Sequence, residues 1–174
     1  MNDHIISKIK AHWPRSLCNH FYKENECLKY LDELSKTVLL EVGLPAKTEK
    51  PNLKFVDTLE LINKNDVLLV KIAYYESFTN YFIELSQGNI VYQTILGEKL
   101  FYVNSGLLTF LSSILLYEEI QQQRSLCPRN TEGDNAAKML TEEFKQQLLR
   151  IDSSLIVKNE YWALCIEEME SGIV

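Results

Sequence analysis

The 174-residue chain lacks several features that would indicate a membrane protein or an enzyme with a common cofactor. No run of 18 apolar residues is present, so no segment is long enough to cross a bilayer as a helix. No glycine-rich phosphate loop, G-x-S-x-G or C-x-x-C motif is present, which removes the usual signatures of nucleotide binding, serine hydrolysis and zinc fingers. The first residues also lack the basic and apolar segments of a secretory signal, and we therefore expect a cytoplasmic protein.

Positive charge is scarce as well. The chain has 18 Lys and Arg against 24 Asp and Glu, a formal net charge of -6. Nucleic-acid binding needs clustered Lys and Arg, so we expect neither nucleic acid nor a membrane as a direct partner. A basic protein partner fits this charge, although a mildly acidic surface also serves solubility alone. With 46% hydrophobic and 24% charged residues, the composition is that of a globular protein, and we expect residues 1–174 to form one domain.

Cysteine and histidine are few and widely spaced. They are Cys18, Cys27, Cys127, Cys165, His4, His12 and His20. These spacings match no usual zinc pattern, and we expect reduced, mostly buried thiols with no metal or other cofactor. A thiol hydrolase that uses Cys127 is an alternative, but this residue has no histidine near it in the sequence, and an incidental thiol is favoured.

Apolar periodicity predicts helices at both ends of the chain and strands in the middle. The expected helices cover about 5–13, 26–41, 105–123, 134–151 and 160–170, and the expected strands cover 53–62, 67–75, 78–85, 90–95 and 99–103. Short turns favour an antiparallel meander of about four strands, because parallel strands need long crossovers. The predicted fold is therefore a single α+β domain whose largely antiparallel or mixed central sheet is flanked by helices.

Short polar side chains mark the ends of two expected helices. Asn104 and Ser105 stand where a strand runs directly into a helix, and both types are strong helix N-caps. Asp134 is the predicted N-cap of the following helix, after a polar loop at 124–133. Adjacent acids such as Glu118 and Glu119 point about 100° apart on a helix, which suits a solvated face better than a catalytic pair.

Aromatic residues crowd two neighbouring expected strands. One face of the sheet must pack against the helices, so about half of these rings belong to the core, and the core assignment is favoured for the group as a whole. Exposed tyrosines beside acidic residues would instead form a binding surface, since tyrosine supplies contact area at a low entropic cost. The candidates for contact with a partner are Tyr74, Glu76, Tyr81 and Glu84.

The segment 101–111 resembles the strand–cap–helix motif of the SUKH (Smi/Knr-like) superfamily, and in particular its SUKH-4-type branch of immunity proteins. The resemblance covers about residues 42–117 and extends to an aromatic-led closing helix at Tyr161 and Trp162. The residues that carry the motif are Gly43, Leu44, Pro45, Asn104, Ser105, Phe110 and Leu111. Gly106 stands where the family motif has a second small hydroxyl residue.

This resemblance implies an α+β fold and a role without catalysis. A SUKH-type immunity protein binds and neutralises a cognate bacterial polymorphic toxin, which is often directed at nucleic acids. The resemblance therefore implies that this chain covers a basic toxin inside the cell. The alternative it leaves open is an adaptor of the same fold that binds other proteins.

Overall fold

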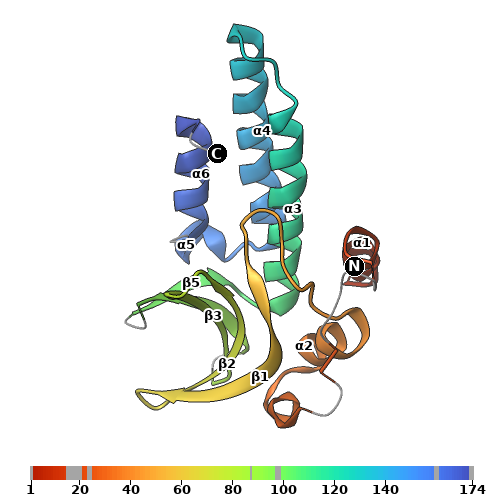
Figure 1. Ribbon diagram of the computed structural model, residues 1–174, viewed down its shortest axis with the longest axis vertical. Helices are drawn as coiled ribbons and strands as arrows, with labels where there is room; N and C mark the ends of the chain where they lie inside the picture. Colours follow the sequence, from red (N-terminus) through yellow and green to blue (C-terminus); the bar gives the residue numbers. More distant parts are fainter. Residues whose placement is uncertain are drawn as a thin grey trace.

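A computed structural model describes residues 2–14, 21–22, 25–86, 88–96, 99–158 and 161–172. Cys18 and His20, which the sequence analysis considered as metal ligands, lie outside these residues. Figure 1 shows a curved sheet at one end of the molecule and a long helical hairpin that extends away from it. The predicted α+β class is confirmed.

Five antiparallel strands form one open sheet in the order β1-β2-β3-β4-β5. They are β1 (Lys54–Lys64), β2 (Val67–Tyr75), β3 (Thr79–Glu84), β4 (Ile90–Ile95) and β5 (Leu100–Asn104). Every strand pairs with its neighbour in the chain, because each connection is a short turn. The antiparallel meander is thus confirmed, with one strand more than the expected four.

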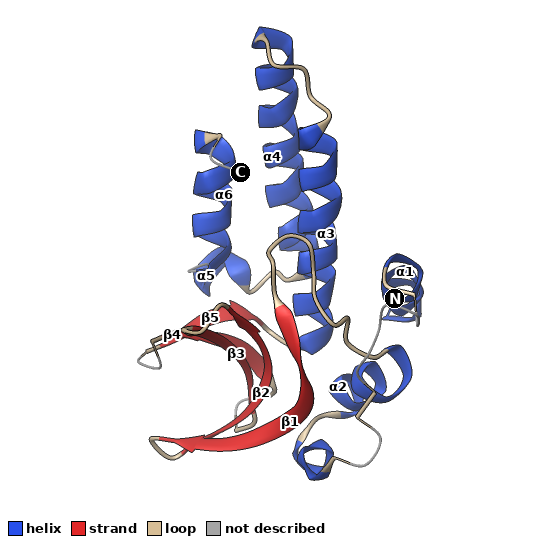
Figure 2. Cartoon of the chain, in the orientation of Figure 1, coloured by secondary structure: helices blue, strands red, loops and turns tan. Residues whose placement is uncertain are grey.

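The sheet has a covered face and an open face. Figure 2 shows that it bends strongly, with α2 (Glu33–Thr37) and the lower part of α3 (Leu107–Ser125) on the convex side. None of the described helices crosses the concave side in this view. On the convex face Tyr81 stacks on Phe110 of α3, with 5.8 Å between ring centroids. Leu69 and Phe82 are also buried, but they lie apart from the main hydrophobic core because they face the concave side.

Two long helices form the hairpin. The second of them, α4 (Thr131–Ile151), packs along α3. The shorter α5 (Leu155–Lys158) and α6 (Tyr161–Ser171) follow, and α6 contacts both α4 and β5. On the other side of α3 lies α1 (Asn2–His12), whose Ile9 and the following Trp13 are buried as the apolar spacing predicts.

The predicted helix at 26–41 is wrong in detail. The segment contains three short helices: a 3-10 helix η1 (Glu26–Tyr30), the α-helix α2, and a π-helix η2 (Val38–Val42). Leu31 is extended, and Asp32 starts a new helix by accepting a 2.6 Å hydrogen bond from the Ser35 N–H. An N-cap of this kind interrupts the run in spite of its apolar periodicity.

Glycine ends this segment. Gly43 has a positive φ of 78°, and its N–H donates a 2.9 Å hydrogen bond to the carbonyl of Val38. A left-handed residue at this position is usually glycine, because a side chain would strain the backbone. Leu44 and Pro45 follow it and are both buried.

The start of α4 corrects another prediction. Its N-cap is Asn130, whose side chain accepts a 3.0 Å hydrogen bond from the Gly133 N–H, whereas Asp134 lies inside the first turn. The turn is so tight that a Cβ on Gly133 would lie 1.7 Å from the carbonyl oxygen of Pro128. The connecting loop is therefore shorter than the expected 124–133.

Asn104 lies at the joint between β5 and α3, but it is not a helix cap. The register of β4 and β5 shifts between Val91 and Tyr92, so that one extra residue of β5 turns Asn104 toward the helices. The N-cap of α3 is Gly106, which has no capping side chain. The predicted capping role of Asn104 and Ser105 is wrong, because the bulge withdraws Asn104 from the helix end.

Asn104 instead connects three elements in the core. Its Nδ2 donates 3.1 Å hydrogen bonds to Ser113 Oγ of α3 and to Asp152 Oδ2, which follows α4. Its Oδ1 accepts a 3.0 Å hydrogen bond from Trp162 Nε1 of α6. Asn104 and Trp162 are fully buried. The motif residues therefore hold the sheet and the helices together, and Phe110 and Leu111 complete the core beside them.

Asp152 is a charged member of this network. Burial alone would raise its pKa, but hydrogen bonds from the Ser105 N–H (2.7 Å), Ser154 and Asn104 outweigh burial and lower the pKa below its ordinary value. A carboxylate that accepts several hydrogen bonds is favoured in its charged form. The charge of Asp152 thus contributes to holding the strand–helix joint.

Candidate functional site

The four candidate contact residues do not form one exposed surface. Tyr81 is only 3% exposed, and its hydroxyl donates to that of Tyr161 at 3.5 Å. Glu84 is also 3% exposed, and its carboxylate accepts hydrogen bonds from the Ser86 N–H (2.8 Å) and hydroxyl. The expectation of a shared surface is therefore wrong, and the core assignment of Tyr81 is confirmed. Tyr74 is half-buried and Glu76 is exposed in the turn after β2.

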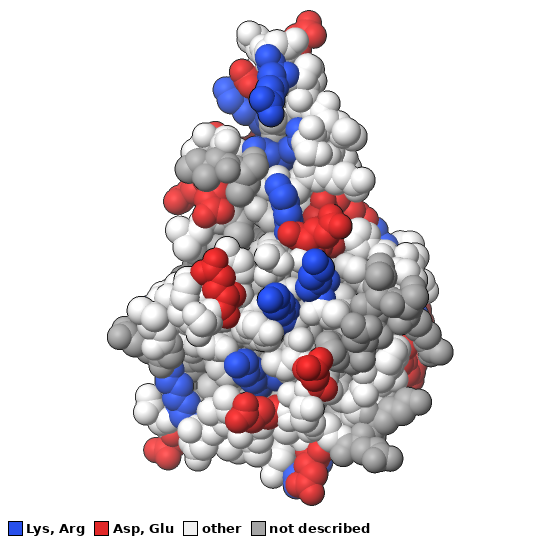
Figure 3. All heavy atoms as spheres, in the orientation of Figure 1, with Lys and Arg blue, Asp and Glu red and all other residues white. Residues whose placement is uncertain are grey.

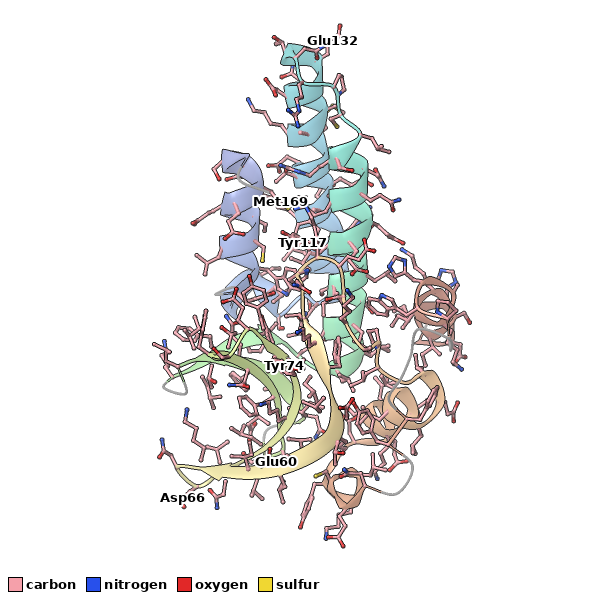
Figure 4. All side chains as sticks on the ribbon, in the orientation of Figure 1. Glu60, Asp66, Tyr74, Tyr117, Glu132 and Met169 are labelled. Atoms are coloured by element: carbon pink, nitrogen blue, oxygen red, sulfur yellow. The ribbon has the colours of Figure 1, made fainter. Side chains whose placement is uncertain are left out.

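Tyr74 belongs to the concave face of the sheet. It pairs across the sheet with Lys54 on one side and Asn80 on the other, and Lys54 pairs in turn with Lys47 in the loop before β1. Directly paired residues of neighbouring strands point to the same face. Figure 4 labels Tyr74 on β2 and Glu60 on the neighbouring strand β1.

Aromatic residues form the next row of the same face. Lys71, Phe82, Tyr92 and Tyr102 are cross-strand partners in sequence from β2 to β5. Lys71 Nζ lies 5.6 Å from the centroid of the Tyr74 ring, a cation–π distance that links the two rows. Phe82 and Tyr102 are buried, whereas Lys71 and Tyr92 are partly exposed. Partly exposed aromatic side chains are enriched where a protein surface contacts another protein.

A hollow of about 400 Å³ lies beside Tyr74. It lies between the loop before β1 and the first part of that strand, and its charged lining residues are Lys47, Lys54 and Asp57. Figure 3 shows blue side chains in the middle of the view, where this loop and the start of β1 lie. The sequence analysis singled out Tyr74 but missed the lysines. The signal that could have identified these lysines is that Lys47, Lys50 and Lys54 recur closely in the sequence.

A larger hollow of about 800 Å³ lies on the other side of the same loop. Glu118 of α3 lies in its wall, with Oε2 2.8 Å from His12 Nε2 of α1. Its Oε1 accepts a 2.6 Å hydrogen bond from the backbone N–H of Glu49. The Glu118 side chain is only 9% exposed, so the expectation of a solvated carboxylate is wrong for this residue. Glu118 therefore fixes both α1 and the loop on α3.

The hollows contain few groups suited to covalent chemistry. Within the part of the chain that the structure describes, neither is lined by a cysteine, and Ser125 of the larger one donates its hydroxyl hydrogen to the Gln122 carbonyl oxygen at 2.6 Å. Cys127 lies elsewhere, at the end of α3, with Sγ 3.7 Å from the carbonyl oxygen of Gln123. Cys165 is buried as expected, and burial, with a smaller contribution from Glu168, raises the pKa of its thiol to about 12.

Among the described residues, no group of three His, Cys, Asp or Glu side chains is placed to hold a metal ion. None of the helices in this part of the chain is both long enough and apolar enough to span a membrane.

Comparison with known proteins gives no relative. No protein-family model, no curated protein and no solved structure matches the chain.

Proposed function

We propose that this chain is an immunity protein of the SUKH type, which binds a cognate bacterial toxin and neutralises it by covering the surface with which the toxin acts on its target. The observation that carries the proposal is the concave sheet face, on which lysine, tyrosine and asparagine side chains are left without a covering helix. Such a face suits contact with a second protein, because aromatic side chains dominate binding energy at interfaces.

The placement of the motif residues is a second support. Asn104 lies at the strand–helix joint and contacts Asp152 and Trp162, so the segment that resembles the family is also the segment that organises the core. The toxin would be directed at nucleic acids and basic overall. The net charge of -6 then speeds the approach of the two proteins.

Co-expression provides the test. The chain is produced together with the toxin domain encoded beside its gene, and cell survival and co-purification are scored. We expect survival and a stable complex, and association in purified form should slow as salt is added. Death of the cells without co-purification would contradict the proposal.

Two substitutions locate the contact surface. Tyr74→Ala is expected to weaken the complex by about tenfold or more, since central aromatic contacts are worth about 2 kcal/mol or more. Tyr30→Ala is the matched control, because Tyr30 is 41% exposed on η1, away from the concave face. Equal affinities of the two variants would exclude the concave face as the contact surface.

The second candidate function is an adaptor that binds a protein other than a toxin. The same concave face supports it. An adaptor would capture a partner without protecting cells from the neighbouring toxin domain, so the survival assay separates the two functions.

A further inference from the structure

We propose that the lysines around Tyr74 bind an acidic segment of the partner protein. The site consists of Lys47, Lys54 and Lys71, named here the lysine row, together with Tyr74. It rests on the proposed function in one respect, that the partner is a protein. The proposal adds that the docking segment of the partner is acidic. It also means that the contact surface carries positive charge although the chain as a whole is acidic.

Sheet register brings the lysine row together from three separate segments. Lys47 of the loop is opposite Lys54 of β1, and Lys54 is opposite Tyr74 of β2. Lys71 lies one row further on the same face, with its ammonium group near the Tyr74 ring. Lys50, at the turn of the same loop, lines the adjoining larger hollow, which also includes Lys47. Lys47 and Lys54 therefore line the hollow beside Tyr74 together with Asp57, and Lys50 and Lys71 lie close to it.

Nearby carboxylates compensate these charges only in part, since Asp57 lines the same hollow and Glu60 is opposite Lys71. In the described part of the chain, none of the lysines at 47, 50, 54 and 71 forms an ion pair. By contrast, Lys8, Lys36 and Lys145 each have a carboxylate within 2.7 Å. Like charges directly opposite each other on paired segments destabilise the pairing. Lys47 and Lys54 are opposite each other in this way. An anionic partner would convert this repulsion into attraction.

The rigidity of the loop favours a preformed site. Thr48 is 1% exposed, its N–H donates to the Leu53 carbonyl at 2.9 Å, and its Oγ accepts from the Leu53 N–H at 3.1 Å. The contact between Glu118 and the Glu49 N–H holds the same loop on α3. A preorganised loop lowers the entropic cost of binding.

The occupant that fits is a short peptide segment rich in Asp or Glu. Carboxylates complement the ammonium groups, and the Tyr74 ring offers an apolar contact between them. A nucleic acid fits less well, because its backbone needs an extended array of cations. Here Glu60 lies directly opposite Lys71, and among the described residues no arginine, the residue best suited to bidentate phosphate binding, lines either hollow.

The experiment measures binding of a fluorescein-labelled deca-glutamate peptide to the purified chain by fluorescence anisotropy at low salt. We expect saturable binding, no binding of the matching deca-glutamine peptide, and loss of affinity as salt is raised. The test variant is K47E/K54E, which reverses two exposed charges. Its affinity should fall about tenfold or more.

The control variant is K10E/K138E. Lys10 on α1 and Lys138 on α4 are also exposed, and the change in net charge is identical. Absence of binding, or equal loss in both double variants, would overturn the proposal. Tighter binding of a ten-nucleotide single-stranded DNA than of the peptide would overturn it in favour of a nucleic acid. Both variants must unfold at the same temperature as the unaltered chain. We expect this because substitutions at exposed sites change stability little.

Binding to the toxin separates this proposal from the proposed function. If the chain binds the toxin domain and K47E/K54E binds it equally well, the lysine row is not the contact and the immunity function stands. If the unaltered chain binds the peptide but not the toxin domain, the lysine row stands and the immunity function fails.

Discussion

Replacing Asn104 by alanine tests the structural role of the strand–helix joint. The substitution removes two donated hydrogen bonds of 3.1 Å and one accepted hydrogen bond of 3.0 Å, all in a fully buried position. A net hydrogen bond contributes about 1 kcal/mol, and a buried donor left without an acceptor, here Trp162 Nε1, costs about 1–3 kcal/mol. We expect Asn104→Ala to lower the free energy of unfolding by about 3–5 kcal/mol.

Urea denaturation followed by circular dichroism measures this loss, with the free energy of unfolding extrapolated linearly to zero denaturant. Ser105→Ala is the matched control. The Ser105 side chain is exposed, and its hydroxyl makes the smallest of the hydrogen-bond contributions to Asp152, whereas the backbone N–H, which the substitution keeps, makes the largest. The expected loss is therefore less than about 0.5 kcal/mol. A double-mutant cycle with Trp162→Phe should give a coupling energy of about 1 kcal/mol.

The size of the loss distinguishes two roles for Asn104. A lost helix cap costs about 1 kcal/mol. A loss of that size for Asn104→Ala, or equal losses for the two single variants, would refute the role of Asn104 as the connection between sheet and helices.

Three further outcomes are expected. Hydrogen bonds lower the pKa of Asp152 in the folded state. The contribution of Asp152 to the free energy of unfolding is therefore complete above a pH of about 4 and is lost as the pH falls through the lowered pKa. Unfolding measured against pH should show this loss in the unaltered chain and a flatter dependence in Asp152→Asn. Arg124→Ala removes a 2.7 Å hydrogen bond to the Met169 carbonyl. It should lower the free energy of unfolding by about 2 kcal/mol and speed hydrogen exchange at the end of α6. An unchanged exchange rate at the end of α6 would contradict this contact. Disulfide exchange with an aromatic reagent should modify Cys127 well before Cys165, because burial raises the pKa of the Cys165 thiol to about 12. Cys127→Ser should remove the fast reaction of Cys127 and leave partner binding intact. Loss of any measured activity in this variant would support a thiol mechanism.

The strands could be predicted well because their signals are local. The expected strands at 67–75 and 90–95 coincide with β2 and β4, and the turns between strands contain few residues. Antiparallel pairing follows directly from such turns. The interior of β1 is less regular than a strand at 53–62 suggests, because the register of β1 and β2 shifts between Phe55 and Glu60.

The joint and the docking surface could not be predicted because they depend on distant partners. The contacts of Asn104 with Asp152 and Trp162 span 48 and 58 residues, and a bulge of one residue decides which way its side chain points. In the sequence Asn104 has the pattern of a cap. The lysine row likewise exists only once Lys47 and Lys71 are brought to either side of Tyr74 by sheet register.

The meander has a consequence for how the chain matures on the ribosome. Each strand can pair as soon as the next one emerges, because all partners are neighbours in sequence. The end of β5 is different, since its anchor in α6 is synthesised 58 residues later. During synthesis the sheet and the contact of Asn104 with Ser113 can therefore form first, and the joint is completed only when the closing helix leaves the exit tunnel.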